Sequence, residues 1–573
     1  MKLPAILLIC LLSAATAAHA QSPAAKLRYP VSAVRLDART LALANARSGS
    51  VSLVDTVERK VRSEITVGKR LSDLAVSSKG LLLLTDAQAH EVITCRLEQQ
   101  QLVERQRVRV SNDPQSIVVS ADGRRAFVVS RWSRRLDLLT IADDDRLAME
   151  QSLELPFPAR ELAMLPDQQH LIVGDAFGGR LAVIDVKSQK VLSVRDVQGH
   201  NLASLVWDGE HDRLLVAHQL LNTLPLTLDN VQWGAAMKNV VRIISREQLL
   251  NPNANLVTDT RLISLGQEGD GSADPNAVLP LTDGSFVVAL AGADELVIVE
   301  STGLVHSRQT LGRRPIALLA GGSERELLAV NQFDSSVIFV DLASETSEVL
   351  SLGPAPTLSA AERGERLFYD ARLSFEKWMS CHSCHTDGHT NGQLADTLGD
   401  GSHGAAKRTL TLLGTRDTDR WAWNGEIKEL HDQVRKSIET SMQGESNAQA
   451  VYDLTAYLHT LEPPPPLAPP RDEADRQQIE AGRQVFAQQR CTQCHIPPLT
   501  YTSHDVYEVW PSQGEPAAKF NPPSLRGVGQ GSRFFHDGRA TALEDVLDVY
   551  GHQVSDPLTD SDRAALLRFL RSL

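Results

Sequence analysis

The chain has 573 residues, a formal net charge of −13 at pH 7 and six cysteines. This length is sufficient for three or four domains with complete hydrophobic cores. The acidic balance argues against nucleic acid and anionic membrane surfaces as partners, because both carry negative charge themselves. Four of the cysteines fall in two CxxC pairs, a pattern that points to a dedicated chemical site rather than to scattered disulfides.

The N-terminal twenty residues, MKLPAILLICLLSAATAAHA, are typical of a secretory signal peptide. A single Lys precedes an apolar run, and Ala18-His19-Ala20 provides a small-x-small cleavage site. The apolar run is too short to cross a bilayer, and no later stretch is long and apolar enough to do so. We therefore expect residues 1–20 to be removed and the mature chain to be a periplasmic protein without a membrane span.

Residues 30–353 repeat one pattern of alternating apolar runs separated by polar turns. A recognisable strand recurs seven times at steps of about 41 to 60 residues: VSLVD, VITCRL, LDLLTI, LAVIDV, VRIISR, LVIVES and VIFVDL. A step of this length holds four strands, which is one blade of a β-propeller. The pattern therefore predicts an all-β seven-bladed propeller, with room for an insertion at residues 218–239. The DG-turn hairpin at 114–130 resembles the YVTN-type repeats of bacterial propellers.

Two Pro-rich breaks divide the remaining chain, one at residues 354–356 and one at EPPPPLAPPR, 462–471. Helical patterns follow each break, so we expect two helical domains at 358–462 and 472–573. The two segments resemble each other in motif order. Each has a helix before CxxCH, then a WNG or HDG turn opening another helix, then a closing amphipathic helix. This internal duplication is stronger evidence than either motif alone.

The two CxxC pairs are compatible with several kinds of site, and the residue that follows each pair distinguishes between them. A shared zinc site is disfavoured because the pairs lie far apart across a Pro-rich linker, and a thioredoxin-like pair lacks its βαβ context. A disulfide within CxxC is strained. Each pair is instead followed by a His, which is the attachment motif of c-type haem. The sequence thus predicts two covalently bound haems, held by Cys381, Cys384 and His385 in the first copy and by Cys491, Cys494 and His495 in the second.

The motifs GERLFYDARLS, CHSCH, WNG, NPPSLRGV and FFHDGRATALEDVL resemble those of the bacterial di-haem cytochrome c peroxidase/MauG family. The resemblance covers residues 358–573 and looks closest to members with an N-terminal propeller. It implies a multidomain protein in which two all-α cytochrome c-like domains follow the propeller. It also implies a Trp between the two haems and, in many members, a calcium ion.

The sixth iron ligands decide whether a haem reacts with peroxide or passes electrons. No methionine follows Met442, so the second domain cannot supply the Met ligand that is common in the family. The family alignment places Tyr550 at that position, as in MauG-type members, and His552 is its competitor. For the first haem, His403 is the nearest match to the family's displaceable His, with an open site as the alternative.

The resemblance also indicates catalytic residues around the first haem. Trp423 in WAWNG matches the inter-haem Trp, and Gln433 matches an active-site Gln. The family's catalytic Glu is expected at position 443, where this chain has Gln443, and Glu439 is the closest carboxylate. This departure weighs against efficient peroxidase turnover, because an amide cannot act as a general acid or base.

Two further sites are expected near the second haem. Arg539 in the HDGRA motif is a candidate partner for the haem propionates, since guanidinium groups bind carboxylates in bidentate fashion. Asn521 and Pro523 lie where family members offer calcium ligands.

The sequence therefore favours a periplasmic di-haem oxidoreductase that uses H2O2 as oxidant. Its electron donor would be a small cytochrome c, a cupredoxin or a protein substrate, with the propeller docking the partner or substrate. Two alternatives remain open: a non-enzymatic electron-transfer protein, and a reductase with an additional cofactor in the propeller. The second alternative would use the propeller histidines His200, His211 and His218 as ligands.

Overall fold

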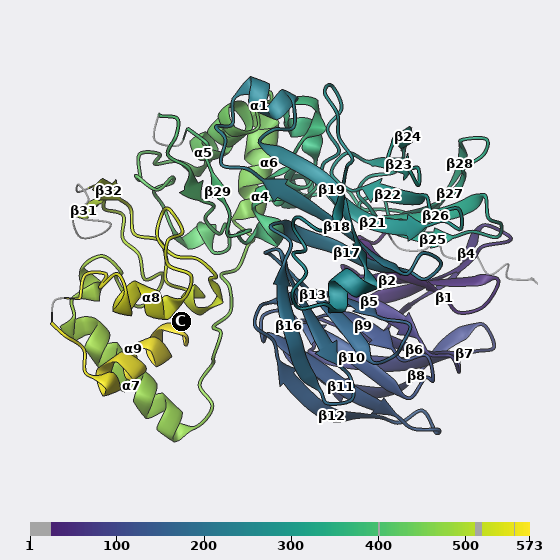
Figure 1. Ribbon diagram of the computed structural model, residues 1–573, viewed down its shortest axis with the longest axis horizontal. Coiled ribbons are helices and arrows are strands. Elements are labelled where there is room, and N and C mark those ends of the chain that lie inside the picture. Colours follow the sequence, from purple (N-terminus) through teal and green to yellow (C-terminus); the bar gives the residue numbers. More distant parts are fainter. Residues whose placement is uncertain (1–24, 399–401, 510–517, 555) are drawn as a thin grey trace, which may run out of the picture.

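The computed structural model describes residues 25–573 apart from 399–401, 510–517 and 555. The predicted signal peptide lies outside these residues. The chain forms a ring of β-sheets followed by a helical part (Figure 1). Among the described residues, no helix combines the length and the hydropathy needed to cross a membrane.

Residues 25–354, all of which are described, contain seven four-stranded antiparallel sheets, so the predicted seven-bladed propeller is confirmed. The first four blades comprise β1 (Pro30–Arg35), β2 (Thr40–Asn45), β3 (Ser50–Asp55), β4 (Lys60–Thr66); β5 (Leu71–Val76), β6 (Leu81–Asp86), β7 (Glu91–Glu98), β8 (Gln101–Arg109); β9 (Pro114–Val119), β10 (Arg125–Ser130), β11 (Arg135–Ile141), β12 (Leu147–Glu154); and β13 (Ala159–Met164), β14 (His170–Asp175), β15 (Arg180–Asp185), β16 (Lys190–Asp196). The last three comprise β17 (His200–Asp208), β18 (Arg213–Leu221), β19 (Met237–Ser245), β20 (Arg261–Ser264); β21 (Pro275–Pro280), β22 (Phe286–Leu290), β23 (Glu295–Val299), β24 (Val305–Thr310); and β25 (Pro315–Ala320), β26 (Glu326–Asn331), β27 (Ser336–Asp341), β28 (Thr346–Ser351).

The seven recurring strands of the sequence are the third strands of the blades, from β3 to β27. Both faces of these strands are buried, because each blade packs against a neighbour on either side. Leu53 and Cys95, for example, belong to one apolar cluster between the first two blades. Each blade takes four consecutive strands, and the ring closes through packing of Leu43 against Leu328 and its neighbours.

The first helical unit contains α3 (Ala360–Phe368), α4 (Cys381–Cys384), α5 (Leu430–Lys436) and α6 (Ala448–Leu458). The second contains α7 (Glu473–Gln488), α8 (Leu543–Asp548) and α9 (Asp560–Leu570). Both depart from the all-α expectation by a small two-stranded ribbon, β29 (Leu394–Ala395) with β30 (Lys407–Arg408) and β31 (Tyr507–Val509) with β32 (Ala518–Phe520). Figure 1 shows the first unit against the propeller and the second unit beside it.

The packing of the two units supports the duplication predicted from sequence. In the first unit, Gly364 of α3 lies directly against the backbone of α6, leaving no room for a side chain. Gly482 of α7 lies in the same way against α9. Four residues after each glycine, Phe368 contacts Tyr457 with ring centroids 5.3 Å apart, and Phe486 contacts Phe569 at 5.4 Å. The same helix pair is therefore built twice from equivalent positions.

An insertion in the fifth blade connects the propeller to the first helical unit. It lies between β18 and β19 and contains the short helix α1 (Leu228–Gln232). Pro225 forms a parallel bridge with Asp396, and the Leu226 amide donates to the Asp396 carbonyl oxygen at 2.9 Å. The insertion predicted at 218–239 thus forms part of the contact between propeller and helices.

Candidate functional site

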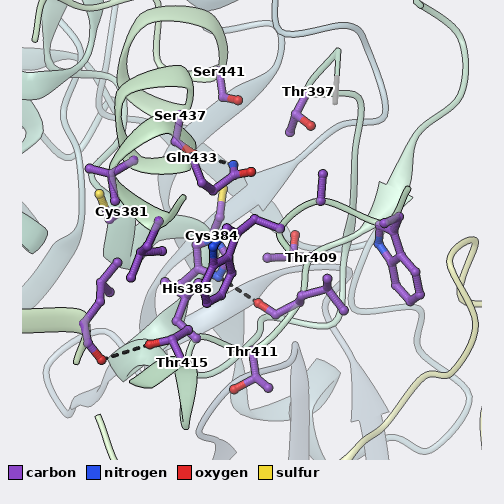
Figure 2. Close-up of a pocket in the computed structure, with 18 of the residues that line it drawn as sticks. Cys381, Cys384, His385, Thr397, Thr409, Thr411, Thr415, Gln433, Ser437 and Ser441 are labelled. Carbon is purple, nitrogen blue, oxygen red and sulfur yellow. Dashed lines mark hydrogen bonds between the residues drawn. The ribbon is translucent and has the colours of Figure 1, made fainter. Parts of the chain in front are cut away.

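A cavity of about 330 Å³ lies beside the first CxxCH motif (Figure 2). Its wall includes Cys381 and Cys384 from the two ends of α4 and the following His385. The apolar part of the wall comes from α3, α5 and α6, through Phe368, Leu430, Val434, Leu454 and Leu458. A mostly apolar pocket with a few polar groups suits a flat cofactor with charged edges.

The His385 imidazole is oriented for metal binding. Its Nδ1 donates to the carbonyl oxygen of Leu410 at 2.8 Å, which leaves Nε2 available. Burial lowers the pKa of His385 to about 4, so the ring is neutral at ordinary pH. A neutral imidazole whose second nitrogen is fixed by a backbone carbonyl is the usual form of a histidine ligand.

The two cysteines are unsuited to thiol redox chemistry. Burial raises the pKa of both Cys381 and Cys384 to about 12, whereas reactive CxxC thiols need a lowered pKa. None of the five described cysteines forms a disulfide. The arrangement fits thioether attachment, which consumes both thiols.

Two buried polar atoms in the cavity wall lack partners within the protein. They are Oε1 of Gln433 and Nε1 of Trp421. Buried polar groups are nearly always hydrogen-bonded, so such atoms in a cavity wall indicate a ligand or water that satisfies them. Together with the free His385 Nε2, they show that the residues present fit a c-type haem.

Figure 2 shows Gln433, Ser437 and Ser441 on one side of His385, with Thr411 and Thr415 on the other. The Gln433 amide donates to the Ser437 hydroxyl at 3.1 Å. Residues Ser437–Ser441 form a π-helical turn, a rare element that often marks functional sites. This side of the cavity is therefore polar, and Lys436 is the charged residue among its lining residues.

The two predicted alternatives for a catalytic carboxylate lie outside this wall. Glu439 is exposed and accepts a hydrogen bond from the Ser446 hydroxyl at 2.6 Å. Gln443 donates instead to the carbonyl oxygen of Leu226 at 2.7 Å. Of the described residues that line the cavity, Asp419 alone carries a carboxylate, and it pairs with His504. The structure thus brings Gln433, but not Glu439, to the cavity.

The other histidines near the first motif have separate partners. His403 is exposed and is not among the cavity-lining residues, so the structure does not bring it to His385. His389 is buried against Trp132 and Phe177 of the propeller and bonds to the Thr411 hydroxyl. Its ring is thus part of the contact with the propeller.

The second motif has the same local geometry with more exposure. His495 donates from Nδ1 to the Tyr501 carbonyl oxygen at 3.0 Å, and burial lowers its pKa to about 4. His552 is a neighbour of His495, and burial lowers the pKa of the His552 imidazole as well. Tyr550 donates its hydroxyl to the carbonyl oxygen of Arg539 at 3.2 Å. Both candidate ligands flank Phe535, with ring centroids 5.4 Å away in each case.

Trp423 lies where the two helical units meet. Its Nε1 donates to the Arg408 carbonyl oxygen at 2.9 Å, and its ring contacts Phe520 and His536 of the second unit. The Trp423 side chain also lines the first cavity. An aromatic ring in this position connects the surroundings of the two motifs.

The remaining predicted residues belong to the second unit. Arg539 forms an ion pair with Asp537 and lies over the Tyr550 ring. The Asn521 amide donates to the carbonyl oxygens of Ser503 and Asp505. Among the described residues, no group of three or more His, Cys, Asp or Glu side chains forms a metal site.

Several residues that line the cavity were not predicted from the sequence. Leu226 comes from the propeller insertion, for which only the longer repeat step gave a signal. Trp421 belongs to the WAWNG motif, from which only Trp423 was selected, and Ser437 and Ser441 have no distinguishing motif. Their role depends on helix geometry that emerges only on folding.

Comparisons with known proteins agree with the motif pattern. Residues 359–461 match the family model described as di-haem cytochrome c peroxidase. The chain is similar to cytochrome c551 peroxidase of Pseudomonas aeruginosa, 23% identical over 42% of this chain and 85% of the relative. It is 22% identical to the cytochrome c551 peroxidase of Nitrosomonas europaea, over 37% of this chain and 79% of the relative.

Among solved structures, the chain is similar to hydrazine synthase of Kuenenia stuttgartiensis, with a TM-score of 0.48 and 19% identity over 56% of this chain and 98% of that one. It is also similar to the dihydro-haem d1 dehydrogenase NirN, with a TM-score of 0.41 and 16% identity over 56% of this chain and 65% of that one.

Proposed function

We propose that this chain, whose C-terminal part matches the di-haem cytochrome c peroxidases, is a periplasmic di-haem oxidoreductase that uses H2O2. The observation that carries the proposal is the cavity in which Cys381, Cys384 and His385 meet the unpartnered polar atoms of Gln433 and Trp421. The duplicated motif at Cys491, Cys494 and His495 supplies the second haem.

The residues around the first haem have separate roles in this proposal. His385 would hold the haem iron through Nε2, because the Leu410 carbonyl oxygen engages Nδ1 and fixes the ring orientation. When bound, haem iron supplies the redox chemistry with peroxide. Gln433 and the Ser437 hydroxyl orient a small polar oxidant by hydrogen bonds, while the apolar wall excludes bulk water.

Among the described residues, the cavity wall provides no carboxylate beside Gln433, so proton transfer at this site should be slow. Gln433 can donate and accept hydrogen bonds but cannot exchange a proton at ordinary pH. This favours a slow, MauG-like oxidation of a protein partner over rapid peroxide turnover. Trp423 lines the first cavity and contacts His536 of the second unit, so its ring would be placed between the surroundings of the two haems.

The partners follow from the same chemistry. A small cytochrome c, a cupredoxin or a protein substrate donates electrons to the second haem, because Thr492 and Gln493 inside its CxxC pair are more exposed than the corresponding residues of the first motif. Calcium binding near Asn521 remains part of the proposal, as does export to the periplasm. A docking role for the propeller also remains a prediction.

One alternative has a specific observation in its favour. The absence of a paired acid and base among the described residues at Gln433 is compatible with a non-enzymatic electron-transfer protein. The propeller-based reductase has less support. His200 binds the Ser383 carbonyl oxygen, His211 pairs with Asp208, and His218 lies beside Arg242.

Optical and EPR spectra of the purified ferric protein test the proposal, recorded before and after one equivalent of H2O2. We expect two haems per chain and a high-spin signal that disappears on addition of peroxide. Two low-spin haems without any response would establish the electron-transfer alternative instead. A Cys384→Ala, His385→Ala variant should lose the responsive signal and keep the second haem.

A further inference from the structure

We infer that the propeller is a built-in part of the first haem site, where Arg131, Arg160 and Asp274 act as positioning residues for the loop that carries His385. This inference rests on the proposed function, because it assigns the surroundings of the same haem. It gives the propeller a role at the redox centre in addition to any docking role.

The clearest contact is at Asp387, two residues after His385. The Asp387 carboxylate accepts a hydrogen bond from Arg131 at 2.9 Å and another from Arg160. Arg131 follows β10 in the third blade, and Arg160 belongs to β13 in the fourth. Both guanidinium groups are largely buried, so their attraction to Asp387 is poorly screened by water.

A second contact lies at the other end of the haem-attachment turn. Asp274, which precedes β21, accepts hydrogen bonds from the hydroxyls of Ser380 and Ser383, at 2.5 and 2.6 Å. His200 of β17 binds the Ser383 carbonyl oxygen at 2.9 Å. These four residues are all buried. The propeller therefore holds Ser383, one of the two residues inside the CxxC pair, by both its side chain and its backbone.

Apolar packing fixes the same loop. Trp378 is 2% exposed and occupies a notch made by Gly234, Gly266 and Gly271, where a side chain at any of the three would collide with the loop. The Asn239 amide donates to the Trp378 carbonyl oxygen at 3.0 Å. These contacts come from the face of the ring on which the innermost strands begin.

The backbone explains why such support is needed. Asp387 has a φ of 51° and Gly388 a φ of 79°, so two successive residues adopt the left-handed conformation. A non-glycine residue there costs roughly 1–2 kcal/mol unless its surroundings compensate. The turn lets the Gly388 amide donate to the His385 carbonyl oxygen at 2.8 Å. The propeller arginines hold Asp387 in this turn and thereby set the orientation of the His385 ring.

Charge gives a second, measurable consequence. Arg131 and Arg160 place two cations beside the single carboxylate of Asp387. Removing one cation destabilises the reduced, more electron-rich haem relative to the oxidised one. The midpoint potential of the first haem should therefore fall when Arg160 is neutralised.

The test measures the midpoint potential and EPR g-values of each haem in the full-length, haem-loaded protein. The variants are Arg160→Gln, Asp387→Asn and the double variant. Arg105→Gln is the control, because Arg105 is an exposed arginine on β8 that pairs with Glu98 and carries the same charge. Asp274→Asn is an independent test at the other end of the loop. The Asn side chain has nearly the same shape as Asp but carries no charge.

We expect Arg160→Gln to lower the potential of the first haem and to change its g-values, with the second haem unchanged. Asp387→Asn removes a negative charge and should shift the potential of the first haem in the opposite direction. Because the two residues are paired, the shift in the double variant should differ from the sum of the two single shifts. First-haem spectra and potentials that match the control would overturn the inference. If Arg160 and Asp387 variants fail to fold, Asp274→Asn decides by the same criteria.

The readout needs haem but not peroxide activity, so the two proposals fail in different ways. Absence of haem at Cys381 and Cys384 in the unaltered protein would refute the proposed function. Haem at that site with a potential indifferent to the propeller variants would refute only the present inference.

Discussion

Gln443 donates a 2.7 Å hydrogen bond to the carbonyl oxygen of Leu226, which ties the end of the π-helical turn to the propeller insertion. Leu226 is 2% exposed, and its side chain lines the cavity. The propeller therefore supplies part of the wall that faces a small oxidant. The side-chain amide of Gln443 thus holds the insertion against the first helical unit.

Replacing Leu226 with alanine should widen the cavity and admit larger oxidants. We expect the ratio of the reaction rate with cumene hydroperoxide to that with H2O2 to rise several-fold. The loss of a buried leucine should also lower the free energy of unfolding by about 2–5 kcal/mol. Stopped-flow spectroscopy measures the rates, and Leu228→Ala, an exposed leucine on the same insertion, is the control. An unchanged ratio would show that Leu226 does not limit access.

The blades were predictable because a similar third strand recurs at a step that holds four strands, which is the length of one blade. The CxxCH motifs were predictable because covalent attachment requires three side chains at fixed spacing. The contact of Arg131 and Arg160 with Asp387 could not be predicted from the sequence. It joins residues 227 positions apart, Arg160 and Asp387, and a lone arginine at the start of a strand carries no local pattern. Glu439 was predicted because it is the carboxylate closest in sequence to position 443. The helix geometry, however, turns its side chain toward solvent.

Gln433 offers a direct test of the missing carboxylate. Gln433→Glu would place an acid–base group where the wall holds an amide, with nearly the same shape. We expect the reaction of the ferric protein with H2O2 to accelerate by on the order of a hundredfold, the scale of general acid–base catalysis. Glu439→Gln, at an exposed position on the π-helical turn that follows α5, should leave the rate unchanged. Equal rates in Gln433→Glu and the parent protein would show that proton transfer does not limit the step.

The second haem's sixth ligand can be assigned by a pair of variants. The sequence favours Tyr550, whereas in the structure the Tyr550 hydroxyl donates to the Arg539 carbonyl oxygen and the buried His552 is a neighbour of His495. We expect His552→Ala to convert the second haem from low spin to high spin, and Tyr550→Phe to leave its spectrum unchanged. EPR at low temperature distinguishes the two. A converted spectrum in Tyr550→Phe alone would instead establish the phenolate ligand.

Glu161 should make the propeller less stable as the pH rises. It lies on the innermost strand β13, where burial and the nearby Asp73 raise its pKa from 4.5 to about 8. Between these values the unfolded chain has lost this proton while the folded chain retains it. Stability then falls with increasing pH, by at most about 1.4 kcal/mol per pH unit.

Glu161→Gln removes this dependence while keeping the side-chain shape. We expect the variant to gain stability over the parent progressively from pH 5 to pH 8, with little difference at pH 5. Urea unfolding of the propeller followed by far-UV circular dichroism at several pH values measures the gain. Glu324→Gln, at an exposed position on the seventh blade, is the matched control and should track the parent throughout. A constant difference across this range would mean that Glu161 is already ionised in the folded ring, with its charge compensated by Arg160.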